Sequence, residues 1–152
     1  MNRLGLIRFT PHYRTVRWGG QHIAQFKNIH LEDTHVGESW EISSLEGMET
    51  VIAEGPLSGM TITDLLRNHG EEILGKKLHE RFGEKFPLLI KFIDAEDDLS
   101  IQVHPDDKQS NGCGKTELWY IIDAQPGAHI YSGFNQKLTH GEMTRILNER
   151  TI

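Results

Sequence analysis

The sequence has little cysteine, an excess of negative charge and no long apolar run, and each shortage excludes a class of protein. Its 152 residues contain one cysteine, Cys113, so an internal disulfide framework is excluded and a reducing compartment is the natural interpretation. The net charge of −6 argues against general nucleic-acid binding, which needs a basic surface. No apolar run is long enough to cross a bilayer. Near the N-terminus Gly5 and Arg8 interrupt the apolar residues, so no secretory signal is expected. Together these features favour a cytoplasmic protein with neither nucleic-acid nor membrane partners.

The overall composition is that of an ordinary globular protein. Hydrophobic residues make up 37% of the chain and charged residues 25%, and the length is sufficient for one domain with its own core. We therefore predict a single domain over residues 1–152.

Short apolar or alternating runs separated by turn residues predict a mainly β fold. The expected strands are residues 34–44, 51–53, 88–95, 99–104, 117–123 and 128–132. Helix is predicted over 64–68, with Thr63 as its N-cap, with one further turn at 71–74. A second helix is predicted over 137–150, with Thr139 as its N-cap. Many short strands with one small helical insertion indicate a β-sandwich or jelly roll.

Two neighbouring runs carry candidate metal ligands. Residues two apart in a strand share a face, so Gln102 and His104 point the same way, as do Lys115, Glu117 and Trp119 in the second run. Imidazole nitrogen and carboxylate oxygen bind zinc, and an amide oxygen can join them. If the two strands are adjacent, the side chains of Gln102, His104 and Glu117 converge on one point beside the Lys115 ammonium.

These runs also resemble a known signature. Gln-x-His-Pro-Asp-Asp at 102–107 and Gly-Lys-Thr-Glu-x-Trp-Tyr at 114–120 resemble the zinc-binding motifs of type I phosphomannose isomerases, a branch of the cupin superfamily. Segments 17–20, 37–43 and 86–91 match the family in the same order, so the resemblance extends from about Phe9 to Leu147. It implies a cupin-type jelly-roll β-sandwich with a small helical insertion.

The resemblance also implies that the fold is incomplete at the C-terminus. Family members continue into a segment of the type Pro-Ala-Gly-x-x-His, whose histidine completes the zinc shell, and then to an arginine near the reacting carbons. Neither segment occurs in this sequence. The chain is therefore expected to be the N-terminal portion of a longer isomerase, with weak or no turnover by itself.

The resemblance assigns roles to six residues. It implies that Gln102, His104 and Glu117 bind zinc. It places Ser100, Lys115 and Glu38 in the pocket for a hexose 6-phosphate, with Lys115 as the candidate catalytic residue; the base that moves the proton is not identified.

Structural roles are the alternatives for several of these residues. Glu38 could form only a salt bridge, Gln102 could do no more than hydrogen bond to a ligand, and Glu117 could lie in water on a surface strand. Trp40 is expected in the core. Asp106 and Asp107 are expected to be turn residues, and Cys113 is interpreted as incidental. No ligand-like spacing marks the other histidines, which are His12, His22, His30, His35, His69, His79, His129 and His140.

Three hypotheses for the function follow. The first is a zinc-dependent aldose–ketose isomerase that interconverts mannose 6-phosphate and fructose 6-phosphate, or part of one. The second is a catalytically silent cupin that binds a sugar phosphate. The third is a partner-binding fragment with a vestigial site. In each case a homo-oligomer could cover open sheet edges.

Overall fold

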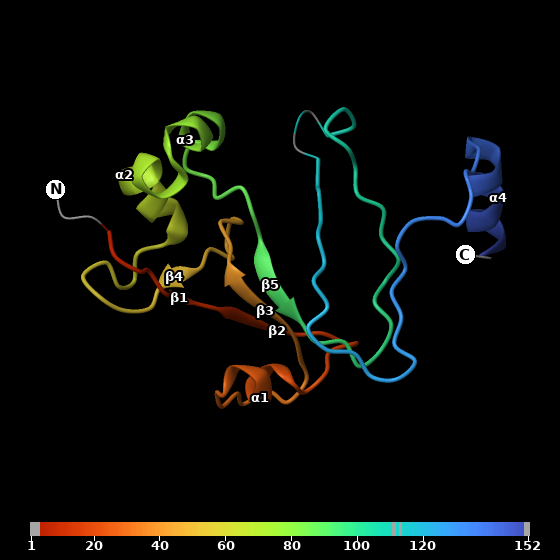
Figure 1. Ribbon diagram of the computed structural model, residues 1–152, viewed down its shortest axis with the longest axis horizontal. Helices are drawn as coiled ribbons and strands as arrows, with labels where there is room; N and C mark the ends of the chain where they lie inside the picture. The colour runs from red at the N-terminus through yellow and green to blue at the C-terminus, as the bar shows by residue number, and fades with distance from the viewer. Residues whose placement is uncertain (1–3, 111, 113, 151–152) are drawn as a thin grey trace. The chain divides into compact units, whose positions relative to one another are not determined.

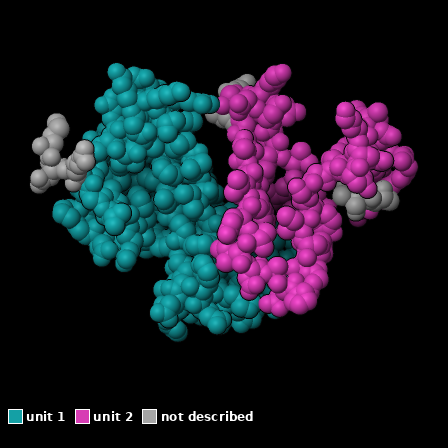
Figure 2. Space-filling view, viewed as in Figure 1, with its two compact units in different colours: residues 1–99 teal, residues 100–152 magenta. Residues whose placement is uncertain are grey.

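The computed structural model describes residues 4–110, 112 and 114–150. The chain divides into two compact units, residues 1–99 and residues 100–152 (Figure 2). Each unit is described by itself. The single domain expected over 1–152 stays a prediction. Within the described part of the chain, no helix combines the length and the apolar character needed to cross a membrane.

The first unit is built on two small antiparallel sheets. One pairs β1 (Phe9–Thr10) with β4 (Val51–Ile52), and the other has the order β2 (His12–Thr15), β3 (Val36–Ile42), β5 (Ile90–Ile93) (Figure 1). The predicted strands over 34–44, 51–53 and 88–95 are confirmed within shorter bounds, and β5 covers half of its predicted range.

Strand β3 is central and mostly buried, because it has a partner on both edges. Arg14 pairs with Glu38, and Trp40 pairs with Lys91. Side chains of directly paired residues lie on the same face of a sheet, and alternate residues of one strand share that face too. The register therefore gathers two cations around Glu38. Trp40 is 8% exposed, which confirms its expected place in the core.

Helix α1 (Ile23–Lys27) contacts β3 through the opposite face of that strand. The Lys27 ammonium donates hydrogen bonds to the Ser39 hydroxyl at 3.1 Å and to the Glu41 carboxylate at 2.6 Å. Ser39 and Glu41 alternate with Glu38 and Trp40 along β3, so each face of this strand carries its own ion pair.

Helix α2 (Ile62–Leu74) begins earlier than predicted and is capped by a different residue. Thr61, and not Thr63, accepts a hydrogen bond from the Asp64 backbone N–H. An N-cap side chain must reach the N–H two or three residues further on, and Thr61 stands at that distance from Asp64. Ile62, Leu65 and Leu66 then face the core, where Leu66 is 0% exposed.

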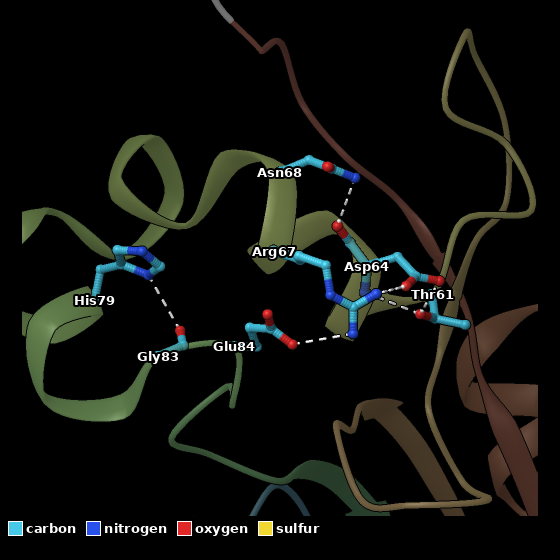
Figure 3. A network of polar contacts seen from close by, with 7 residues as sticks. All are labelled: Thr61, Asp64, Arg67, Asn68, His79, Gly83 and Glu84. Atoms are coloured by element: carbon cyan, nitrogen blue, oxygen red, sulfur yellow. Dashed lines mark hydrogen bonds and ion pairs between the residues drawn. The ribbon is translucent and has the colours of Figure 1, made fainter.

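An Arg67-centred network of polar contacts joins α2 to the loop that follows α3 (Lys76–Phe82) (Figure 3). The Arg67 guanidinium donates to Asp64 at 2.6 Å and to Glu84 at 3.0 Å. Thr61 also donates to Asp64, so the cap and the ion pairs share one carboxylate. Helix α3 contacts α2 and was not predicted from the sequence.

The described residues of the second unit lack the strands that were predicted there. Strands were expected over 99–104, 117–123 and 128–132, yet the described residues of this unit contain no assigned strand and one helix, α4 (His140–Glu149). A strand needs a neighbour for its backbone N–H and C=O groups, and alternation in a sequence does not supply that neighbour. The predicted cap of α4 is confirmed, since Thr139 forms a capping box with Glu142.

Candidate metal and substrate site

His104 and Glu117 lie in contact although 13 positions separate them in the sequence. The His104 Nε2 atom is 2.9 Å from the Glu117 Oε2 atom, and the side chains are 21% and 33% exposed. A backbone hydrogen bond from the Lys115 N–H to the Pro105 carbonyl, at 3.1 Å, holds the two segments together beside this pair. The convergence that strand alternation predicts for His104 and Glu117 is therefore present without a β-ladder.

Gln102 and Ser100 interact with each other on the segment before His104. The Gln102 amide nitrogen donates to the Ser100 hydroxyl at 2.8 Å. This bond orients the amide and uses its nitrogen, so the carbonyl oxygen is the atom that Gln102 could offer to a cation. The assignment of Gln102 as a ligand and of Ser100 as a pocket residue stays a prediction.

The loop between the two segments is shaped by its aspartates, as the sequence analysis expected for turn residues. Asp106 Oδ1 accepts from the Gln109 N–H at 2.8 Å, and Asp107 Oδ1 accepts from the Gly114 N–H at 3.0 Å. A Cβ at Gly114 would lie 2.6 Å from the Asp107 nitrogen, so this approach requires glycine. Cys113 lies outside the described residues.

A pocket of about 340 Å³ opens at this turn. Its lining residues all belong to the second unit: His104, Pro105, Asp106, Asp107, Gly114, Lys115 and Thr116. Pockets for small ligands begin at about 300 Å³, so a sugar phosphate is of suitable size. One imidazole and one ammonium thus line a space large enough for the expected substrate.

The groups around Glu117 favour its ionised form. Burial raises the pKa of Glu117, but hydrogen bonds from His104 and Trp119 and the charges of Lys115 and His104 outweigh it, so the pKa is lowered from its ordinary value. The ionised carboxylate is the form that binds cations. Trp119 and Lys115 share the predicted face of Glu117, and both act on it in the structure.

The donor set fits a divalent metal in part. Among residues 4–110, 112 and 114–150, no group of three or more His, Cys, Asp or Glu side chains could hold a metal ion. His104 and Glu117 supply two of the donor types that zinc prefers, and an amide oxygen from Gln102 would make a third.

Glu38, in the first unit, accepts three hydrogen bonds. Its Oε1 atom accepts from Lys91 at 2.7 Å, and its Oε2 atom accepts from Arg14 and from the Trp40 indole, both at 2.9 Å. The side chain is 7% exposed. Burial raises the pKa of Glu38. The hydrogen bonds from Lys91 and Trp40 and the charges of Lys91 and Arg14 outweigh that effect, so the pKa lies below its ordinary value. The salt-bridge alternative is therefore realised, while a role in substrate binding stays a prediction.

No role was expected for the two cations that contact Glu38. Lys91 carried a usable signal, because it is the one charged residue in the apolar run Leu88–Ile93. Arg14 carried none, since it lies between other polar residues and meets Glu38 only through the β2–β3 register.

Comparison with known proteins gives consistent matches. The family described as "Phosphomannose isomerase type I, catalytic domain" matches residues 6–146. The mannose-6-phosphate isomerase ManA of Bacillus subtilis (strain 168) is 35% identical over 144 residues, which are 91% of this chain and 44% of that protein. A mannose-6-phosphate isomerase of Streptococcus mutans is 35% identical over 124 residues, which are 79% of this chain and 38% of that protein.

A solved structure gives the same match. The crystal structure of the mannose 6-phosphate isomerase from Bacillus subtilis superposes with a TM-score of 0.78 at 32% identity. The match covers 95% of this chain and 46% of the solved chain. The expected cupin-type fold is thereby confirmed. The chain spans less than half the length of the curated relatives that it matches.

Proposed function

Because the chain belongs to the family of type I phosphomannose isomerase catalytic domains, we propose that it supplies the metal-binding part of an enzyme that interconverts mannose 6-phosphate and fructose 6-phosphate. The observation that carries this proposal is the contact between His104 and Glu117, at 2.9 Å, beside a pocket that His104 and Lys115 line. Imidazole and ionised carboxylate are ligands of a divalent metal, and an ammonium attracts the phosphate of a sugar phosphate.

We propose zinc as the metal, held by Gln102, His104 and Glu117. When bound, zinc supplies a Lewis acid that stabilises negative charge developing on sugar oxygens. The Gln102–Ser100 hydrogen bond orients the amide toward this role. The hydrogen bond from His104 and the charge of Lys115 lower the pKa of Glu117 against the effect of burial and so favour the ionised carboxylate that binds a cation.

Lys115, Ser100 and Glu38 have the proposed substrate roles. The reaction moves a proton between C1 and C2 through an enediol-type intermediate. The Lys115 ammonium binds a phosphate or sugar oxygen and is the proposed catalytic residue, while the Ser100 hydroxyl donates to the same substrate. Glu38 acts through Lys91 and Arg14, since its own oxygens already accept from these donors.

The alternative is a silent cupin that binds a sugar phosphate without turnover. Within the described part of the chain, His104 and Glu117 are the two titratable donors that meet at the site. Catalytic zinc commonly has more protein ligands than two. We also propose, for either function, that a homo-oligomer covers open edges of the fold.

Metal binding and turnover separate these functions. The purified chain is stripped with a chelator and titrated with zinc by calorimetry, and coupled isomerase activity is then measured on mannose 6-phosphate. We expect zinc binding that His104→Ala or Glu117→Gln weakens at least ~10–100-fold. His140→Ala is the matched control, because His140 is exposed on α4 and should leave zinc affinity unchanged.

The outcomes are distinct. Zinc binding with zinc-dependent turnover, even at the weak level expected of this chain by itself, supports the isomerase, and binding of mannose 6-phosphate with no turnover supports the silent cupin. Equal zinc affinities for the wild type and the His104→Ala variant would contradict the proposed metal site.

A further inference from the structure

In the described part of the chain, no β-ladder joins the two segments that carry His104 and Glu117, so other bonds set their alignment. The ion pair between these side chains is partly exposed, and such pairs contribute little to stability. A backbone bond crosses between the segments beside it, from the Lys115 N–H to the Pro105 carbonyl. An antiparallel pair normally returns such a bond, but proline has no N–H to donate. The segments therefore need a further bond that fixes their register.

The Asp107 carboxylate supplies this bond. Its Oδ1 atom accepts from the Gly114 N–H at 3.0 Å, across seven positions of the chain. Its backbone carbonyl also accepts from the Gly112 N–H at 2.7 Å, so Asp107 closes the turn through two different oxygens. The carboxylate bond joins positions that lie three residues inside the His104–Glu117 contact on each side. Both contacts therefore fit one antiparallel alignment of the two segments.

Asp106 stands next to Asp107 but forms a different kind of bond. Its Oδ1 atom accepts from the Gln109 N–H, so this bond stays within the first half of the turn. The second half approaches Asp107 closely, because a Cβ at Gly114 would lie 2.6 Å from the Asp107 nitrogen and 2.8 Å from its Oδ1 atom. Of these two adjacent aspartates, Asp107 is thus the one whose side chain joins the segments.

We propose that Asp107 is a positioning residue of the candidate metal site, which holds Glu117 against His104 by fixing the register of the turn. A slip of one residue would turn Glu117 to the other face of its segment, away from His104. The role requires an oxygen acceptor at this position and no charge. Its consequence for zinc rests on the proposed function, since donors that are already in place bind a cation more tightly than donors that must first be ordered.

Asparagine and alanine at position 107 test this role in the metal-free chain. Asparagine keeps an oxygen acceptor and removes the charge, whereas alanine removes both. The ring nitrogen signals of His104, recorded by NMR at one pH near neutral, report on its contact with Glu117, and the Glu117→Ala variant gives the signals of the lost contact. We expect Asp107→Ala to move these signals more than halfway to those of Glu117→Ala. Asp107→Asn should leave them close to those of the wild type.

Zinc titration by calorimetry then measures the consequence at the site. Asp107→Ala should weaken zinc binding at least ~10-fold, which is the size of effect expected for a residue that orients metal ligands. Asp107→Asn should restore the affinity to within about threefold of the wild type, because its amide oxygen accepts from the same N–H. Gly114→Ala is a second perturbation and should resemble Asp107→Ala, since its new Cβ would push the two segments apart.

Two substitutions in the same unit serve as matched controls. Asp123→Ala removes a bond of the same kind, because the Asp123 Oδ1 atom accepts from the Ala124 N–H at 2.9 Å, but that bond joins neighbouring residues. Gly141→Ala adds a Cβ that meets no atom within 4 Å. Both controls should leave the His104 signals and the zinc affinity unchanged.

Three results would overturn the proposal. One is a set of His104 signals in Asp107→Ala that equals that of the wild type. Another is a zinc affinity that Asp107→Ala leaves unchanged. The third is an Asp107→Asn variant that binds zinc as weakly as Asp107→Ala, which would assign the effect to charge. A wild-type chain that binds no zinc would count against the proposed function alone, because the His104 signals still test the position of Glu117.

Discussion

Replacing Glu38 with glutamine should destabilise the first unit by about 2–4 kcal/mol at neutral pH. The carboxylate is 7% exposed and accepts from Lys91, Arg14 and Trp40. Glutamine keeps the shape but carries no charge, and its NH₂ group presents a donor where one oxygen now accepts. Hydrogen bonds to charged groups contribute about 1.5–3 kcal/mol each, and breaking a buried ion pair costs about 3–5 kcal/mol. The expected cost is lower than the sum of these contributions, because the Arg14 side chain is 45% exposed and water can replace the hydrogen bond that it loses.

The loss of stability in Glu38→Gln should depend on pH, and its direction follows from the lowered pKa of Glu38. The pKa of Glu38 is lowered in the folded state, so its ionised form adds stability above the unfolded pKa of a glutamate, about 4.3. That stability is lost as the pH falls through the lower folded pKa. Glutamine does not titrate at this position. The difference between wild type and Glu38→Gln is therefore largest near neutral pH and shrinks in acid.

Urea unfolding followed by tryptophan fluorescence measures this difference, with titrations at several pH values from 7 down to about 3. Trp40 reports on the site directly, because its indole donates to Glu38. Glu54→Gln is the control, since Glu54 is 67% exposed and its ion pair with Arg8 spans 3.5 Å, so its change should stay within about 0.5 kcal/mol. A loss below 0.5 kcal/mol for Glu38→Gln, or one that is constant with pH, would contradict a stabilising role of the ionised Glu38 carboxylate.

Three further substitutions test the packing and the caps. Leu66→Ala should cost about 2–5 kcal/mol in urea unfolding, because Leu66 is 0% exposed on α2, and a loss under 1 kcal/mol would contradict its place in the core. Gly37→Ala should cost about 1–3 kcal/mol, because the new Cβ would lie 2.7 Å from the Gly19 Cα atom; Gly141→Ala, with no atom within 4 Å, serves as the harmless comparison. Thr139→Ala should remove about 1 kcal/mol of helix stability and reduce helicity by circular dichroism, since Thr139 caps α4; unchanged helicity would count against that cap.

The elements that sequence predicted well are those with a local cause. The helix with Thr139 as its N-cap was expected, and its cap forms because Thr139 stands three positions before Glu142, a spacing that allows both bonds of a capping box. Strand β3 was expected from alternation, and it forms because β2 and β5 lie on its two edges.

The wrong predictions involve partners that lie elsewhere in the chain or outside it. Residues 117–123 alternate like a strand, but no neighbour supplies a ladder, so they stay unpaired by β-bridges within the described structure. Thr63 was predicted as the N-cap and Thr61 has that role, because periodicity does not fix the first helical turn.

The types of donor at the candidate site, and the alternation that separates Gln102, His104 and Glu117 from their apolar neighbours, follow from the order of residues alone, because side-chain direction along extended backbone is a local property. The contact of His104 with Glu117 across a turn, and the contacts of Lys91 and Arg14 with Glu38, become visible only in the folded chain. Those contacts depend on strand register and loop closure, which bring distant positions together and which no local pattern encodes.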